Sequence, residues 1–136
     1  MRAMLEKLVV TSLLVVFAAA FGSTLVMKGF SLTEEEAVEI SRNSGLVQKY
    51  AANASSFILE THYYNLSEIE RLKQLHSDPI FQNAPEDYFW ERSLPEGHTA
   101  WEVIWWFHYG IGGYDVGVFV DADTGIIIYE ALGASD

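Results

Sequence analysis

The last third of the chain alternates between apolar and other residues with a period of two, and this pattern constrains the fold more than any other feature. One face of its first segment consists entirely of aromatic and β-branched residues: Trp101, Val103, Trp105, Phe107 and Tyr109. This period is typical of β-strands, whose successive side chains point to opposite faces. Further strands are predicted at residues 114–120 and 126–131, after glycine-rich and Asp-Thr-Gly turns. Such short connections predict an antiparallel meander.

Two helical segments and another strand are predicted ahead of the meander. Residues Thr33–Glu36 have the form of a capping box, so a helix is expected from there to about Ser44, ended by Gly45. Residues 46–52 indicate a second short helical piece, and residues 57–64 indicate the first strand. The expected fold class is therefore α+β, with an N-terminal helix packed on a mainly antiparallel sheet of about four strands.

An inserted segment at about residues 66–98 separates the first strand from the meander. Leucine and isoleucine recur at helical spacing between Leu66 and Leu75, which predicts an amphipathic helix ending near Ser77. All three prolines of the chain fall in residues 78–98, which we expect to be mostly loop. Within this loop, Tyr88–Trp90 is either a short strand or an anchor packed onto the sheet.

The N-terminal residues 1–28 are expected to lie outside this domain. From Leu8 to Met27 there are 20 residues without a charged side chain. A helix of about 20 residues spans roughly 30 Å, the thickness of the hydrocarbon core of a bilayer, and few core helices of soluble proteins show so long an apolar run. The segment is therefore either an anchor that crosses the membrane through residues 8–27 or a signal peptide cleaved after Ala20. In both cases residues 29–136 are exported, as a membrane-anchored domain facing the extracytoplasmic side or as a secreted one.

The charge of the exported part excludes one class of partner. Residues 29–136 contain 18 acidic and 5 basic side chains, a net charge of −13. Such a domain repels nucleic acid and anionic lipid headgroups, whereas a cationic partner is compatible with it. The chain has no cysteine, so disulfides, thiolate chemistry and Cys-ligated zinc are all impossible.

No catalytic or metal-binding motif is found. The sequence Asp121-Ala-Asp123 begins like an EF-hand loop, but the glycine expected at position 6 is Ile126 and the glutamate expected at position 12 is Leu132. Asp121 is expected instead to bond the amides of its own turn. The four histidines do not have the spacing of a metal site, and the chain has neither a nucleophile elbow nor a phosphate-binding loop. We therefore predict no cofactor, no metal and no enzymatic activity.

Three short motifs, taken in order, resemble those of the PepSY family. They are Leu32-Thr-Glu-Glu-Glu-Ala37 at the start of the helix, Trp101-Glu-Val103 at the start of a strand, and Val120-Asp-Ala-Asp-Thr-Gly-Ile-Ile127 at the last hairpin. The resemblance covers roughly residues 32–52 and 100–131, and the inserted helix and loop depart from it. PepSY domains are small α+β modules found in propeptides of secreted metallopeptidases and in many exported or membrane-anchored proteins.

The resemblance implies a non-catalytic module that contacts other proteins and that, in some members, inhibits a peptidase. We therefore expect a protein partner, with a co-exported peptidase as one class. The alternative is a carrier or sensor of a small apolar ligand, in which the inserted helix and loop roof an aromatic pocket against the sheet.

Aromatic side chains are the candidate contacts for a partner. Trp105 and Trp106 are consecutive, so their rings lie on opposite faces of a strand, and one is expected to be exposed unless the Tyr88–Trp90 segment covers it. The candidate partner-binding residues are Trp90, Trp105, Trp106 and Tyr109. Asn53 and Asn65 both fit the N-glycosylation sequon and are candidate modification sites in a host that glycosylates.

Overall fold

The computed structural model describes residues 31–135, which form an α+β domain with one four-stranded antiparallel sheet, as the sequence predicts. The strands follow the order β1-β2-β3-β4, a simple meander in space. Their bounds are Ser56–Tyr64 for β1, Ala100–His108 for β2, Gly113–Asp121 for β3 and Ile127–Ser135 for β4. The expected anchor or signal segment, residues 1–28, lies outside the described residues. Within 31–135, no helix has the length and apolar character needed to cross a membrane.

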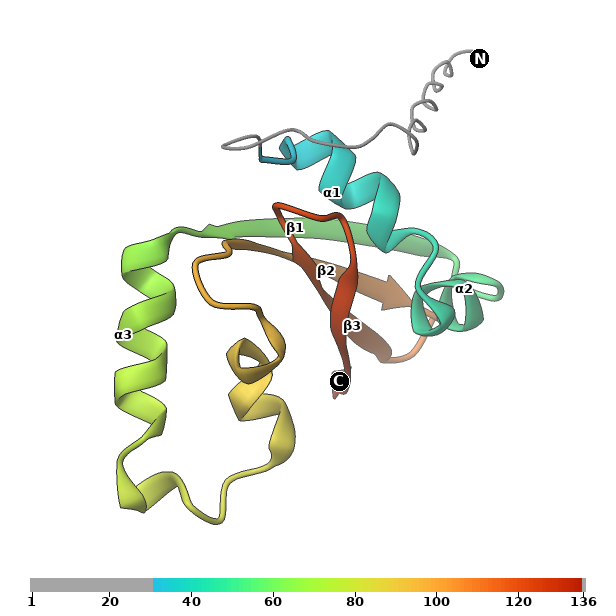
Figure 1. The fold of residues 1–136 in the computed structure, drawn as a ribbon. Helices are drawn as coiled ribbons and strands as arrows, with labels where there is room; N and C mark the ends of the chain where they lie inside the picture. The colour runs from blue at the N-terminus through green and yellow to red at the C-terminus, as the bar shows by residue number, and fades with distance from the viewer. Residues whose placement is uncertain (1–30, 136) are drawn as a thin grey trace. The chain divides into compact units, whose positions relative to one another are not determined.

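Within residues 31–135, three α-helices and two 3-10 helices accompany the sheet. They are α1 at Glu34–Ser41, α2 at Gly45–Ala51, α3 at Leu66–His76, η1 at Pro79–Phe81 and η2 at Glu86–Ser93. Figure 1 shows α1 and α2 on one side of the sheet and α3 with the yellow segment of residues 79–93 on the other. The inserted segment therefore forms a second layer. The prediction that residues 78–98 are mostly loop is wrong for Pro79–Phe81 and Glu86–Ser93, which are 3-10 helices.

Side-chain caps determine where the helices begin. Thr33 at the start of α1 and Asn65 at the start of α3 both form complete capping boxes, with Glu36 and Glu68 as their partners. The predicted role of Gly45 is wrong, because α1 ends at Ser41 and Gly45 is the first residue of α2. The physical reason is the preceding serine, Ser44, whose extended backbone and hydroxyl cap α2 by accepting from the amide of Val47.

The main core lies between the sheet and the helices α1 and α2. Its buried residues are Ala37, Val47, Val103, Trp105, Phe107, Val116, Val118 and Val120. Buried residues alternate along β2, as the period of two in the sequence predicts, whereas β3 is buried on both faces from Val116 onwards. The indole N–H of Trp105 donates to the hydroxyl of Ser41 at 2.9 Å, so the one polar atom of this large ring is satisfied.

A second, smaller core lies on the opposite face of the sheet, beneath α3 and η2. It consists of Ile69, Trp90, Leu94, Ala100 and Phe119. The Trp90 ring stacks on Phe119 with centroids 4.4 Å apart and also contacts Tyr64 at 4.9 Å. Of the two alternatives for Tyr88–Trp90, the anchor is confirmed, and it takes the form of a 3-10 helix rather than a strand.

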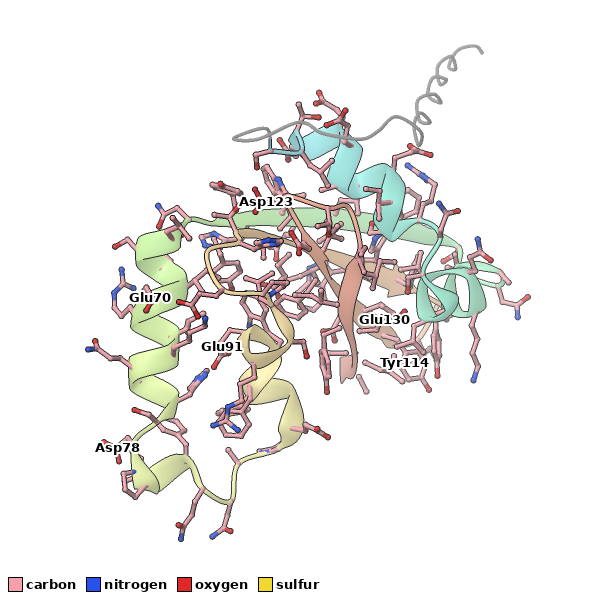
Figure 2. All side chains as sticks on the ribbon, in the orientation of Figure 1. Glu70, Asp78, Glu91, Tyr114, Asp123 and Glu130 are labelled. Carbon is pink, nitrogen blue, oxygen red and sulfur yellow. The ribbon has the colours of Figure 1, made fainter. Side chains whose placement is uncertain are left out.

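A buried hydrogen bond joins α3 to η2 within this second layer. His76 Nδ1 lies 2.8 Å from Glu91 Oε2, and both side chains are buried. Figure 2 shows Glu91 between the two elements. The other carboxylate oxygen of Glu91 is buried without a hydrogen-bond partner among the described residues. A buried carboxylate oxygen without a hydrogen-bond partner opposes folding. Apolar contacts such as the stacking of Trp90 on Phe119 favour folding and help to hold this layer on the sheet.

The substitution Trp90→Ala tests this anchor. We expect it to lower the free energy of unfolding by about 3 kcal/mol, because it leaves a cavity where the indole stacks on Phe119. The neighbouring substitution Tyr88→Ala is the control; since Tyr88 is half exposed, it should cost less than about 1 kcal/mol. Urea denaturation of the full chain measures both values, and equal losses would contradict the anchoring role.

Candidate functional site

The α3–η2 layer covers only one end of its face of the sheet and leaves the other end accessible. The accessible end carries three apolar side chains from two adjacent strands, Ile58 on β1 and Ile104 and Trp106 on β2. Ile58 stands directly across from Trp106 in the antiparallel register and is 59% exposed. Cross-strand neighbours of this kind form one contact surface. We call these three residues, together with Glu60, Glu102 and Asp115, the open face.

Carboxylates surround the indole at the centre of the open face. The N–H of Trp106 donates to Glu60 Oε1 at 3.3 Å, and Asp115 lies across from Trp106 on β3. Asp115 lies across from Gly133 on β4, where a β-carbon added to the glycine would come within 2.7 Å of the Asp115 Oδ1 atom. A side chain at position 133 would therefore displace the Asp115 carboxylate from its place over β4. The open face thus combines an aromatic ring with negative charge, a pairing suited to cationic side chains.

Glu102 is the carboxylate of the open face that is most perturbed. It accepts a hydrogen bond of 2.9 Å from the hydroxyl of Tyr64. Partial burial raises the pKa of Glu102 above its ordinary value, although the Tyr64 hydrogen bond and the charge of His62 act in the opposite direction. Burial and the nearby Glu102 charge likewise raise the pKa of Tyr64. Glu102 therefore takes up a proton more readily than an exposed glutamate does.

The structure places the four candidate aromatic residues in three different environments. Trp90 and Trp105 are 6% and 2% exposed and belong to the two cores, so their expected role as surface contacts is wrong. Tyr109 packs beside the main core, where its hydroxyl donates to the backbone carbonyl of Tyr50. Trp106 alone among the four lies on the open face. Of the two consecutive tryptophans, it is therefore the one that faces outward.

Sequence reasoning missed the neighbours of Trp106 on the adjacent strands. Ile58 and Glu60 share a face of the first predicted strand, but their position across from Trp106 depends on the register between β1 and β2. A tight turn fixes the register of a hairpin, whereas the connection here is the whole inserted segment. A turn does join β2 to β3, so the partnership of Trp106 with Asp115 could have been found by counting outward from Gly110.

The turn between β3 and β4 holds a network of hydrogen bonds. The buried Asp121 accepts from the amides of Asp123 and Thr124 at 2.8 and 3.2 Å, which confirms the predicted bonding within the turn. Its other oxygen lies 2.7 Å from His98 Nδ1. His98, Asp121 and Asp123 bring potential ligand atoms within 4.8 Å of one another. Both oxygens of Asp121 thus have hydrogen-bond donors within the protein. These hydrogen bonds explain how a carboxylate can be buried in this turn.

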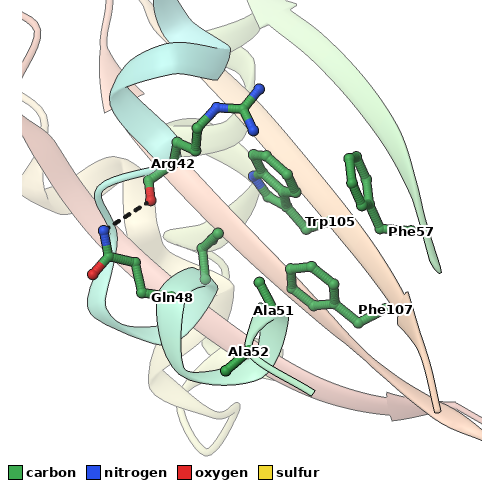
Figure 3. Close-up of a pocket in the computed structure, with 8 residues that line it drawn as sticks. Arg42, Gln48, Ala51, Ala52, Phe57, Trp105 and Phe107 are labelled. Atoms are coloured by element: carbon green, nitrogen blue, oxygen red, sulfur yellow. Dashed lines mark hydrogen bonds between the residues drawn. The ribbon is translucent and has the colours of Figure 1, made fainter. Parts of the chain in front are cut away.

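A pocket of about 340 Å³ opens on the other side of the sheet, beside α2. We call it the α2 pocket, and Figure 3 shows its side chains. It is lined by residues of α2, β1 and β2 and of the segments that follow α1 and α2, namely Arg42, Val47, Gln48, Ala51, Ala52, Phe57, Trp105 and Phe107. An aromatic pocket was expected instead between the sheet and the inserted helix. Between the sheet and the inserted segment, Ile69, Trp90 and Phe119 form a packed cluster instead.

The two glycosylation candidates, Asn53 and Asn65, have exposed side chains. Asn65 also caps α3 through its side-chain oxygen.

Comparisons with family models, with curated proteins and with solved structures find no match to this chain. The geometry of the open face and of the α2 pocket therefore provides the evidence on function.

The substitution Glu102→Gln tests the perturbed carboxyl group. A raised pKa in the folded state means that folding favours the protonated form, so this stabilisation is present below the ordinary pKa and is lost as the pH rises through the folded pKa. Glutamine stays neutral and can still accept from Tyr64. The variant should therefore be more stable than the wild type at pH 7, with a gap that closes towards pH 4.

Urea denaturation across this pH range measures the gap. The control is Glu70→Gln on the exposed surface of α3, which should change the free energy of unfolding by less than about 0.5 kcal/mol. A difference in the free energy of unfolding between Glu102→Gln and the wild type that widens as the pH falls would contradict the raised pKa of Glu102.

Proposed function

We propose that this chain is a non-catalytic, extracytoplasmic interaction module that resembles PepSY domains and binds a co-exported protein through the open face. A peptidase is the partner class that the resemblance implies, with binding or inhibition as the outcome. The uncharged residues 8–27 would hold the module at the membrane, or would export it if they are cleaved.

The observation that carries this proposal is the unequal covering of the sheet. One end of the face is closed by Trp90 and its neighbours, while Trp106 and Ile58 at the other end remain accessible. A partly exposed tryptophan beside an exposed aliphatic side chain is typical of an energetically important contact between proteins. The α+β architecture and the order of its helix, strands and final hairpin are compatible with the family resemblance.

The charges of the open face indicate the chemistry of the partner. Glu60, Glu102 and Asp115 lie on the three strands around Trp106. A lysine or arginine of the partner can lie against the indole and pair with these carboxylates, and complementary charge also speeds association. Because Glu102 protonates readily, such a partner should bind more weakly as the pH falls towards 4.

Site-specific crosslinking in the native membrane tests the proposal. A photo-crosslinking amino acid at position 58 of the full chain should form an adduct with a co-exported protein, which mass spectrometry identifies. Adding Trp106→Ala should reduce the yield of this adduct at least fivefold, because the central aromatic contact is lost. Adding Asp115→Asn should reduce it less, since the charge lies at the rim.

The same photo-crosslinker at Ile126, which is equally exposed but lies in the β3–β4 turn, serves as the control. It should not yield the adduct. Equal yields from positions 58 and 126, or a yield that does not respond to Trp106→Ala, would contradict binding through the open face. If the captured protein is a peptidase, its activity in the presence of excess chain distinguishes inhibition from simple binding.

A further inference from the structure

The α2 pocket lies in a part of the domain where the charge pattern reverses. Residues 40–59 contain no Asp or Glu, although the exported part of the chain is strongly acidic overall. The same stretch carries Arg42 and Lys49, two of the five basic residues beyond Lys28. Both α2 and the first residues of β1 come from this stretch. The surface around the pocket is therefore suited to a negatively charged ligand rather than to the cationic partner of the open face.

The walls of the pocket are aromatic and partly accessible. Phe57 on the edge strand is 50% exposed, and its ring lies 5.3 Å from that of Trp105 and 6.3 Å from that of Phe107, measured between centroids. Val47 on α2 lines the same pocket. A half-exposed phenylalanine next to two buried aromatic rings leaves apolar area that a bound apolar group would remove from water.

Arg42 provides the polar end of the pocket. Its guanidinium lies 5.2 Å from the centroid of the Trp105 ring, and Figure 3 shows it extended above that ring. Gln48 donates to the backbone carbonyl of Arg42 at 3.5 Å and so links α2 to the end of α1. Stacking on a ring limits the motion of a guanidinium while leaving its N–H groups able to bind a carboxylate with two hydrogen bonds.

The ion pair that Arg42 already forms with Glu39 does not prevent Arg42 from binding a ligand carboxylate. Glu39 lies 3.6 Å away within the same helical turn, and both side chains are at least half exposed. Exposed ion pairs of this kind contribute little, so a ligand carboxylate that also gains apolar contacts can replace Glu39. The other nearby carboxylate, Glu130, accepts from the backbone amide of Leu46.

From these observations we infer that the α2 pocket binds a small monocarboxylic acid with an apolar body. The apolar body would contact Phe57 and Phe107, and the carboxylate would bind the Arg42 guanidinium. A volume of about 340 Å³ lies near the lower end of ligand pockets, which run from about 300 to 1,000 Å³, so the ligand is a compact aromatic or short aliphatic acid. This site is distinct from the open face and does not depend on its function.

The probe is 3-phenylpropionate, compared with its uncharged analogue 3-phenylpropanol. The full chain in nanodiscs, with ¹⁵N-labelled tryptophan, reports binding at each indole N–H. The acid should shift the Trp105 signal and leave the Trp106 signal unchanged, because the two rings lie on opposite faces of β2. We expect the acid to bind at least tenfold more tightly than the alcohol, since hydrogen bonds to charged groups are the stronger ones.

Two arginine substitutions form a matched pair for this measurement. Arg42→Gln should abolish the preference for the acid, so that acid and alcohol bind equally. Arg92→Gln, which alters an arginine stacked on Phe89 in the other layer, should preserve the preference. A Trp105 signal that does not respond to either probe, equal binding of acid and alcohol by the wild type, or a preference that survives in Arg42→Gln would each overturn the inference.

Discussion

The apolar face that strand β2 turns towards α1 and α2 is the constraint on which the rest of the structure depends. Its inward residues Val103, Trp105 and Phe107 form the floor of the main core, and Ala100 at its start lies in the second core. The whole of the first face and the Ala100 end of the other therefore need covering layers, because apolar surface must be removed from water. The helices α1 and α2 supply one layer, and the inserted segment supplies the other. The Trp105 indole, bonded to Ser41, fixes how α1 lies across the strand.

The inserted segment determines where the molecule can bind a partner. It is long enough to cover the end of the sheet near Ala100 and Phe119, where Trp90 is anchored, but the far end around Trp106 stays accessible. The buried contacts of Trp90 and the partial exposure of Trp106 thus both result from the extent of the inserted segment. The inserted segment therefore shapes the surface that we propose for recognition.

The parts of the fold that depend on local sequence could be predicted, and those that depend on distant contacts could not. The capping boxes at Thr33 and Asn65, the alternation in β2 and the bonding of Asp121 within its turn all follow from residues close in sequence. Ser44 favours the start of a helix and Gly45 favours the end of one, and in the structure Ser44 caps the start of α2. The position of Ile58 across from Trp106 and the α2 pocket both require the β1–β2 register, which no short turn encodes.

The two binding surfaces have opposite charge preferences, and the pleat of β2 explains how they remain separate. Consecutive residues Trp105 and Trp106 point to opposite faces, so one ring lies beneath Arg42 while the other lies next to Glu60. The ion-pairing groups on each face are separated by the thickness of the sheet and its side chains. At physiological ionic strength, interactions between exposed charges fade over about 8 Å, so each surface responds mainly to its own charges. A strongly acidic domain can therefore present one site for cationic groups and another for a carboxylate.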